Sequence, residues 1–302
     1  MKMTIVGKVE NMNVGSDYFN CNVVSNKGER LNLKLTKEQA SLIKVEQVYH
    51  FKYQTITINE KVNYQVTEFT DVLNTIDNLA EAQERLAPFY QFAPLEMSKV
   101  EAEVEGYLNK ITNPILIKIT KNLYQKYKKE FYLYPAAVKF HHAYVGGLAY
   151  HTKTMLKIAE KLLEVYDFIN QDLVYSAIIL HDLCKTKELT SLAGGEYTKE
   201  GQLIGHLVLI SGEVMIEASK HNLEKSEEVL QLNHILLAHH GLPHFGAAKR
   251  PQTAEALLVW YIDTIDSKFR VIEESLKEVA EGEFTSIINV ADKMRYYKHK
   301  VK

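Results

Sequence analysis

Histidine and aspartate side chains recur through the second half of the chain at the ends of apolar segments, where their spacing would allow them to bind metal ions. His181 and Asp182 directly follow the apolar residues 177–180, so we expect them at the buried end of a helix. A carboxylate beside an imidazole is costly to bury unless a counter-charge or a metal ion compensates it. The full series of candidate donors is His151, His181, Asp182, His206, His239, His240, Asp263 and Asp266.

The donor types indicate which ions and which chemistry this series would support. Imidazole and carboxylate donors suit Mn²⁺, the ion we expect first, and also Fe²⁺, Co²⁺, Ni²⁺ or Zn²⁺. The series holds more donors than one ion needs, so we expect two ions that share Asp182 and a water molecule. Such a centre makes the water a nucleophile for phosphorus, and Lys185 would hold a phosphate oxygen. Asp182 and Lys185 are therefore the candidate catalytic residues, although an isolated histidine more often packs in a core.

A helical region is predicted to position these donors, because the apolar periodicity turns helical after residue 71. Each donor falls near an end or on the inner face of a separate helix, and helix bundles build metal sites by converging such side chains. The predicted helices span residues 72–87, 98–111, 114–129, 147–166, 171–181, 201–221, 226–239 and 253–281.

The N-terminal part of the chain has a different texture, with short segments in which apolar and polar residues alternate. These segments predict five strands, over residues 4–10, 18–25, 30–36, 48–58 and 62–69, with a helical piece over 37–44. A helix between the third and fourth of five strands is the order of the OB-fold barrel, although other small barrels share the strand count. We therefore expect an α+β multidomain chain: an OB-like barrel over 1–70 that binds single-stranded nucleic acid, a helical linker over 71–95 and an all-α domain over 96–302.

Composition is that of an ordinary globular protein, with 46% hydrophobic and 25% charged residues. The chain has two cysteines, which lie far apart in the sequence, so we expect no disulfide framework. This cysteine usage predicts a reducing compartment. No uninterrupted apolar stretch is long enough for a membrane span, and the first residues lack an apolar signal core. We therefore expect a cytoplasmic protein. The net charge of −2 does not by itself indicate a nucleic-acid binder, which would need a local basic patch.

Five segments carry a resemblance to a known family. They are residues 141–152 (HHAYVGGLAYHT), 197–206 (YTKEGQLIGH), 238–241 (AHHG), 251–256 (PQTAEA) and 263–268 (DTIDSK). These segments resemble motifs of the YhaM-type 3′→5′ exoribonucleases, which are HD-domain metal-dependent phosphohydrolases, over roughly residues 95–275. The chain departs from the pattern at Cys184, where many HD proteins have glycine, and at residues 246–248, where Gly-Ala-Ala replaces a GSP-like segment.

The resemblance implies roles for individual donors. His151, His181, Asp182 and Asp263 would form the core metal set, and Asp266 competes with Asp263 for the last of these roles. The resemblance also assigns a second ion to three further histidines, namely His206, His239 and His240.

The resemblance also implies an activity, the trimming of single-stranded RNA, or of DNA, from its 3′ end to 5′-mononucleotides. The family carries an N-terminal OB-type domain, in agreement with the strand pattern. Two other functions remain open: hydrolysis of a small or cyclic nucleotide, and a non-enzymatic role as a single-strand-binding accessory protein. A homo-oligomer is also open, although no coiled-coil heptads occur.

Contacts to a nucleic-acid strand are expected on the barrel and beside the metal centre. OB surfaces stack bases on aromatic side chains beside a basic groove, and alternation along the strands leaves only some of the aromatics outside. The candidates are Tyr18, Phe51, Tyr53, Lys34 and Lys52 on the barrel, and Lys249 and Arg250 after the AHHG segment.

Overall fold

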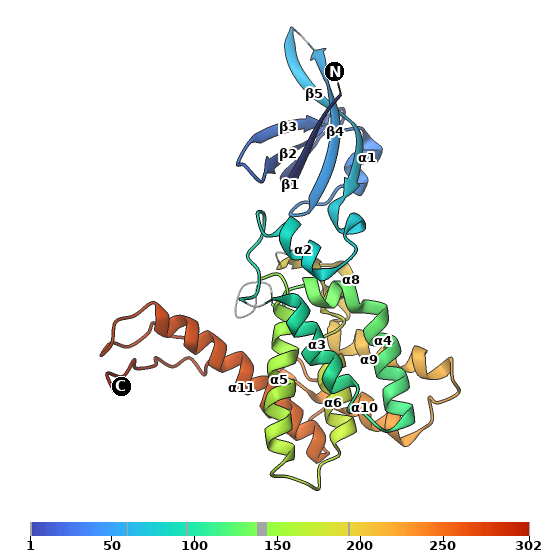
Figure 1. Ribbon diagram of the computed structural model, residues 1–302, viewed down its shortest axis with the longest axis vertical. Helices are drawn as coiled ribbons and strands as arrows, with labels where there is room; N and C mark the ends of the chain where they lie inside the picture. Colours follow the sequence, from blue (N-terminus) through green and yellow to red (C-terminus); the bar gives the residue numbers. More distant parts are fainter. Residues whose placement is uncertain (1, 59, 95, 138–143, 193, 302) are drawn as a thin grey trace.

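The computed structural model describes residues 2–58, 60–94, 96–137, 144–192 and 194–301. A small β-barrel lies at one end of the molecule, and a helical region makes up the remainder (Figure 1). The predicted fold class, a five-stranded barrel followed by a helical domain, is confirmed. The limits 1–70, 71–95 and 96–302 stay a prediction as domain boundaries.

The barrel closes in the strand order β1-β2-β3-β5-β4. Its elements are β1 (Lys2–Val14), β2 (Phe19–Ser25), β3 (Arg30–Lys34), α1 (Lys37–Leu42), β4 (Val48–Ile58) and β5 (Lys61–Asp71). The helix α1 falls between β3 and β4, as the sequence predicts. Its start is set by a reciprocal pair of hydrogen bonds between Thr36 and Gln39, which is a capping box.

The helical region is built mainly from eight helices and two short helical turns among the described residues. They are η1 (Val72–Thr75), α2 (Leu79–Leu86), α3 (Met97–Leu108), α4 (Pro114–Leu133), α5 (Gly147–Leu163), α6 (Gln171–Leu180), α9 (His206–Ser219), α10 (Glu227–Ala238), η2 (Pro243–Phe245) and α11 (Ala254–Lys277). Two short helices, α7 (Lys185–Glu188) and α8 (Lys199–Leu203), flank a hairpin of β6 (Leu189–Ser191) and β7 (Gly194–Tyr197). The hairpin corrects the expectation that this region is entirely α-helical.

Two predicted helices are in fact broken. The helix expected over 72–87 is interrupted before Asn78, whose side chain accepts from the Glu81 backbone and begins α2. The helix expected over 201–221 is interrupted at Gly205, which has a φ of +77° that side chains other than glycine rarely adopt. The break at Gly205 makes His206 the first residue of α9, where its side chain turns toward the centre of the bundle.

Helix α6 is the central element of the bundle. It contacts α4, α5, α10 and α11, and all of its residues from Val174 to Leu180 are buried. A helix that is apolar on all sides is stable only inside a core. The residues that follow it, His181 and Asp182, are consequently buried as well, with 1% and 3% of their surface exposed.

Helix α11 packs against α5, α6 and α10 along its first half and then extends beyond the bundle (Figure 1). The C-terminal segment after it returns alongside, and the ammonium group of Lys268 binds the carboxylate of Asp292 to hold the two together. Among the described residues, no helix is both long enough and apolar enough to cross a membrane.

Candidate metal centre

Five helices each contribute one or two donors to a single buried centre. His151 lies on the first turns of α5, and His181 and Asp182 follow the end of α6. His206 begins α9, while His239 and His240 follow the end of α10. The remaining donor, Asp263, lies on the inner side of α11, about a turn before Asp266. Side chains from five helices therefore meet at one point.

Asp182 lies in the middle of this centre, with its two carboxylate oxygens facing opposite histidines. Oδ2 is 3.2 Å from Nε2 of His181 and 4.0 Å from Nε2 of His151. Oδ1 is 3.2 Å from Nε2 of His206 and 3.8 Å from Nε2 of His239. A carboxylate with this placement can bind one ion through each oxygen.

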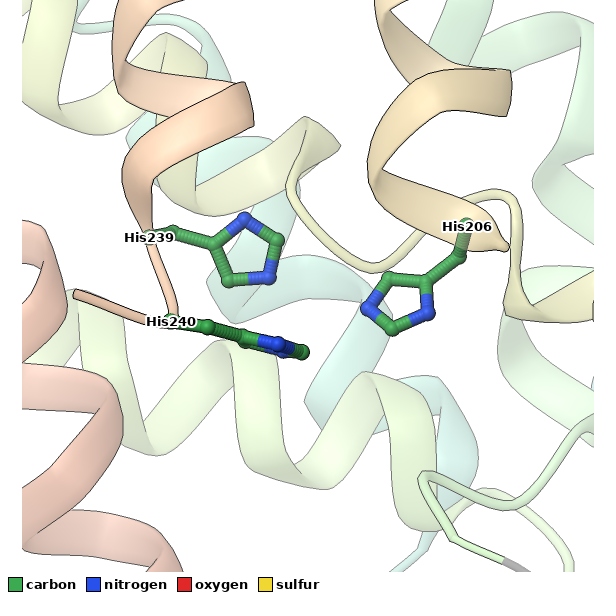
Figure 2. A group of neighbouring side chains, drawn as sticks. All are labelled: His206, His239 and His240. Atoms are coloured by element: carbon green, nitrogen blue, oxygen red, sulfur yellow. The ribbon is translucent and has the colours of Figure 1, made fainter. Parts of the chain in front are cut away.

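The donors form two groups, one on each side of Asp182. Donor atoms of His151, His181 and Asp263 lie within 4.8 Å of one another, and so do those of His206, His239 and His240. Figure 2 shows the second group, with the three rings gathered between the end of α10 and the start of α9. Three donors plus one oxygen of Asp182 are enough for one divalent ion in each group.

Every one of these five histidines is anchored through its Nδ1 atom, which leaves Nε2 facing the centre. The Nδ1–H groups donate to the carboxylates of Asp266 (2.6 Å, from His151) and Glu188 (2.7 Å, from His206) and to the carbonyl oxygens of Ile178 (2.7 Å, from His181), Leu236 (2.8 Å, from His239) and Phe245 (2.9 Å, from His240). An acceptor at one ring nitrogen fixes the tautomer in which the other nitrogen is a metal donor.

Four buried polar atoms at this centre have no hydrogen-bond partner: Nε2 of His181, His206 and His239, and Oδ1 of Asp182. Buried polar groups are nearly always paired, so four such donor atoms gathered around one point are suited to bind a cation. The donor set consists of imidazoles and carboxylates, which fits a divalent transition metal. Cys184, the nearest thiol in sequence, packs in the hydrophobic core.

The carboxylates of the centre are held in their ionised form. Burial alone would raise the pKa of Asp182, but the charges of His181 and Lys185 lower that pKa well below its ordinary value. Burial opposes ionisation of Asp263 in the same way, and its hydrogen bond with His151 lowers its pKa. The pKa of His239 is lowered, chiefly by burial, which favours a neutral imidazole ready to bind a cation.

Lys185 and Asp266 have clear positions beside the two groups. The ammonium group of Lys185 lies 2.7 Å from Oδ2 of Asp182 and donates to the carbonyl of Ala136 at 2.8 Å. Asp266 lies behind His151, bonded to its Nδ1, and is 3.6 Å from Nε of Arg270. Asp263, rather than Asp266, thus lies among the donor atoms of the first group.

The prediction that Phe51 and Tyr53 of the barrel contact a nucleic-acid strand is wrong. Phe51 is fully buried and Tyr53 is 8% exposed, because both face the barrel interior from β4. Among the other barrel candidates, Tyr18 is 56% exposed, whereas Lys52 is paired with Glu68 at 2.6 Å. Lys34 is half-buried on β3, and Lys249 and Arg250 are exposed after the AHHG segment.

The outer face of the barrel carries an array of asparagines that the sequence analysis did not identify. In the strand register, Asn11, Asn22 and Asn32 lie side by side across β1, β2 and β3, and Asn13 and Asn20 form the next row. Their amides are linked by hydrogen bonds of 2.7–3.1 Å. Asparagine at the alternate positions 20 and 22 of a predicted strand is the signal in the sequence, while Asn11 and Asn13 lie beyond the predicted limit of the first strand, which β1 exceeds.

Part of one motif, the residues His141, His142 and Ala143, lies outside the described residues. The rest of that motif forms the start of α5. Gly146 has a φ of +78°, and a side chain there would collide with Met97. The requirement for glycine at this turn fixes the direction in which α5 presents His151.

Comparisons with known proteins agree with this centre. A family model of the HD domain matches residues 148–268, which include all of the donors. A 3′-5′ exoribonuclease YhaM from Geobacillus sp. (strain WCH70) is 38% identical over 214 residues, which are 71% of this chain and 66% of that protein. Its counterpart from Bacillus subtilis (strain 168) is 37% identical over 70% of this chain and 67% of that protein.

A longer match is found with a relative from Listeria. The 3′-5′ exoribonuclease YhaM of Listeria innocua serovar 6a is 34% identical over 254 residues, which are 79% of this chain and 81% of that protein. Among solved structures, a chain from a replication protein A heterotrimer bound to ssDNA matches 28% of this chain and 66% of that chain, at 15% identity and a TM-score of 0.22, too low for any inference. Through its barrel, its HD domain and these relatives, the chain belongs to the YhaM family of 3′-5′ exoribonucleases.

Proposed function

We propose that this protein is a metal-dependent 3′→5′ exoribonuclease that trims single-stranded RNA to 5′-mononucleotides. The observation that carries the proposal is a set of four unpaired buried donor atoms, three from histidines and one from Asp182, within an HD domain. Membership of the YhaM family favours RNA as the substrate over a small or cyclic nucleotide. It also favours an enzyme over a non-enzymatic binding protein.

The centre would hold two divalent ions. His151, His181 and Asp263 would bind one ion together with Oδ2 of Asp182, and His206, His239 and His240 the other together with Oδ1. Mn²⁺ is the ion we expect first, although Fe²⁺, Co²⁺, Ni²⁺ and Zn²⁺ accept the same donors. Bound ions of this kind lower the pKa of water and neutralise phosphate oxygens, which is the chemistry that phosphodiester hydrolysis requires.

Residues around the ions would bind and orient the strand. The ammonium group of Lys185, already beside Asp182, would contact an oxygen of the scissile phosphate. Lys249 and Arg250, which are exposed after the histidine pair, would contact phosphates further along the strand. The barrel would hold the strand through its amide array, Tyr18 and Lys34, and we place the protein in the cytoplasm, in keeping with its two unpaired cysteines.

The direct test uses the full-length chain, a 5′-labelled single-stranded RNA and a titration of Mn²⁺. We expect a ladder of shortened products with Mn²⁺, none with EDTA, and none with Asp182→Ala, because that change removes a ligand from both ions. The exposed Asp167→Ala, in the turn between α5 and α6, should degrade the RNA at the wild-type rate.

Two outcomes would contradict the proposal. One is a wild-type chain that binds RNA but forms no shortened product with any of the five metals. The other is an Asp182→Ala variant that still degrades RNA. A parallel assay on single-stranded DNA of the same sequence measures how strictly the enzyme requires RNA.

A further inference from the structure

An exposed aromatic side chain is coupled directly to one of the histidines of the metal centre. Phe245 lies on the short helical turn η2, five residues after His240, and 60% of its surface is exposed. Its carbonyl oxygen accepts the Nδ1–H of His240 at 2.9 Å, so the backbone of Phe245 and the imidazole of His240 are fixed relative to each other. An exposed phenyl ring therefore lies at the edge of a buried polar centre.

The loop that carries Phe245 is held rigidly. Gly241 adopts a φ of +74°, and its α-carbon lies against the face of Trp260, where a β-carbon would be 1.9 Å from the indole ring. The ring of His244 packs on that of Phe245, with 4.2 Å between their centroids. The backbone of this loop is thus fixed at Gly241 and at the carbonyl of Phe245, and the phenyl ring packs on His244.

The opposite side of the centre is also apolar and exposed. Leu203 is 74% exposed and Ile204 is 48% exposed, and both directly precede Gly205 and His206. The rings of His206 and His240 have their centroids 5.2 Å apart, so the histidines that follow Ile204 and precede Phe245 in the sequence lie side by side. Figure 2 shows both rings, one from the start of α9 and the other from the end of α10.

A polar centre for phosphate that is bordered by exposed apolar side chains matches the chemistry of a nucleotide. The phosphate is an anion, whereas each base has two apolar faces that stack on aromatic rings whatever the sequence. We propose that Phe245 stacks on the base next to the scissile phosphate and so positions the 3′ end of the strand. This inference rests on the proposed function and names a binding subsite for it.

The test compares wild type with Phe245→Ala on a 5′-labelled RNA and on the same RNA with abasic nucleotides at its last two positions. With the intact RNA, we expect Phe245→Ala to raise KM by about tenfold to a hundredfold, with little change in kcat. With the abasic RNA, the two enzymes should have the same KM, because the partner of the phenyl ring is absent. Phe245→Trp should restore the wild-type KM on intact RNA.

The Phe245→Ala variant should fold as the wild type does. Phe245 is mostly exposed, and its bond to His240 uses the backbone, which alanine retains. The matched control is Phe168→Ala, which changes another exposed phenylalanine (73%), in the turn at the far end of α5 from His151, and the KM of this variant should equal that of wild type.

Equal penalties from Phe245→Ala on intact and abasic RNA would overturn the inference, and so would an unchanged KM on intact RNA. Either result leaves the proposed function standing if wild type still shortens the RNA. A wild-type chain that shortens neither RNA overturns the proposed function itself, and the stacking subsite with it.

Discussion

Two of the five imidazoles at the centre are anchored by carboxylates, and three by carbonyl oxygens. The carboxylates belong to Asp266, behind His151, and Glu188, behind His206, so each metal group contains one histidine of this kind. A carboxylate partner makes an imidazole a more basic ligand and fixes its orientation. The same device therefore orients one imidazole in each donor group, on either side of Asp182.

The different positions of Asp263 and Asp266 lead to different expected effects of mutation. Asp266→Asn retains an acceptor for His151 but loses its charge, so Mn²⁺ affinity should fall by about tenfold to a hundredfold, with activity restored at high Mn²⁺. Asp263→Asn replaces an anionic donor of the first group by a neutral, weaker one, and its activity should not be restored by Mn²⁺. Metal titration by calorimetry, together with RNA assays over the same concentrations, measures both. Rescue of Asp263→Asn but not of Asp266→Asn would reverse these assignments.

The helices that carry the donors were largely predictable from the sequence, but the positions at which helices break were not. Periodicity predicted α5, α6, α10 and α11 because each has a continuous apolar face. It missed the break at Gly205, since the apolar residues on either side continue the helical period and only the backbone angle of Gly205 departs from it. The sequence analysis also missed that Phe51 and Tyr53 lie inside the barrel. Alternation places both side chains on the same face of the strand but does not say which face is inside.

A buried carboxylate, that of Glu213, holds helices α4, α7 and α9 together. Glu213 on α9 lies 2.6 Å from the ammonium groups of both Lys126 on α4 and Lys187 on α7, and its side chain is 9% exposed. Burial would raise the pKa of Glu213, but hydrogen bonds from Lys126 and Lys187 lower it from 4.5 to about 2. Because α7 follows Asp182 and Cys184, these ion pairs also fix the segment that carries the metal-binding carboxylate.

The lowered pKa of Glu213 gives a stability that depends on pH. The stabilisation is fully present above the pKa of the unfolded chain, near 4.5, and is lost as the pH falls toward 2. Glu213→Gln should therefore lower the free energy of unfolding by about 2 kcal/mol at pH 7, with the difference from wild type shrinking below about pH 5. Urea unfolding at several pH values measures this. The control is Glu164, an exposed carboxylate that pairs with Lys161. Glu164→Gln should change the free energy of unfolding by less than about 0.5 kcal/mol.

At the scale of the whole molecule, the barrel and the metal centre would act on different parts of one strand. The amide array lies on the outer face of the barrel, at the opposite end of the molecule from the tip of the bundle (Figure 1). Side-chain amides can form hydrogen bonds with the edges of bases. Because each amide offers both a donor and an acceptor, a change of base removes little of this hydrogen bonding. A long RNA would benefit from this second contact, whereas a dinucleotide would not reach it.

Removal of the amides should therefore affect long substrates alone. The double variant Asn22→Ala and Asn32→Ala should raise KM for a 20-nucleotide RNA by about fivefold, which corresponds to roughly 1 kcal/mol of hydrogen bonding. Hydrolysis of a dinucleotide should be unchanged, and Asn26→Ala in the exposed turn after β2 is the control. An equal effect of the double variant on both substrates would point to misfolding and argue against this role for the barrel.

The anchoring of every imidazole through Nδ1 has a consequence for how the centre is loaded. Because the five rings are held by partners other than the ions, the chain has no rearrangement to complete when an ion arrives. Uptake should then be limited by the rate at which the ion sheds its own water, and that rate differs between metals. The apo protein would keep the shape of the holo protein, so that exchange of one metal for another leaves the strand-binding surfaces in place.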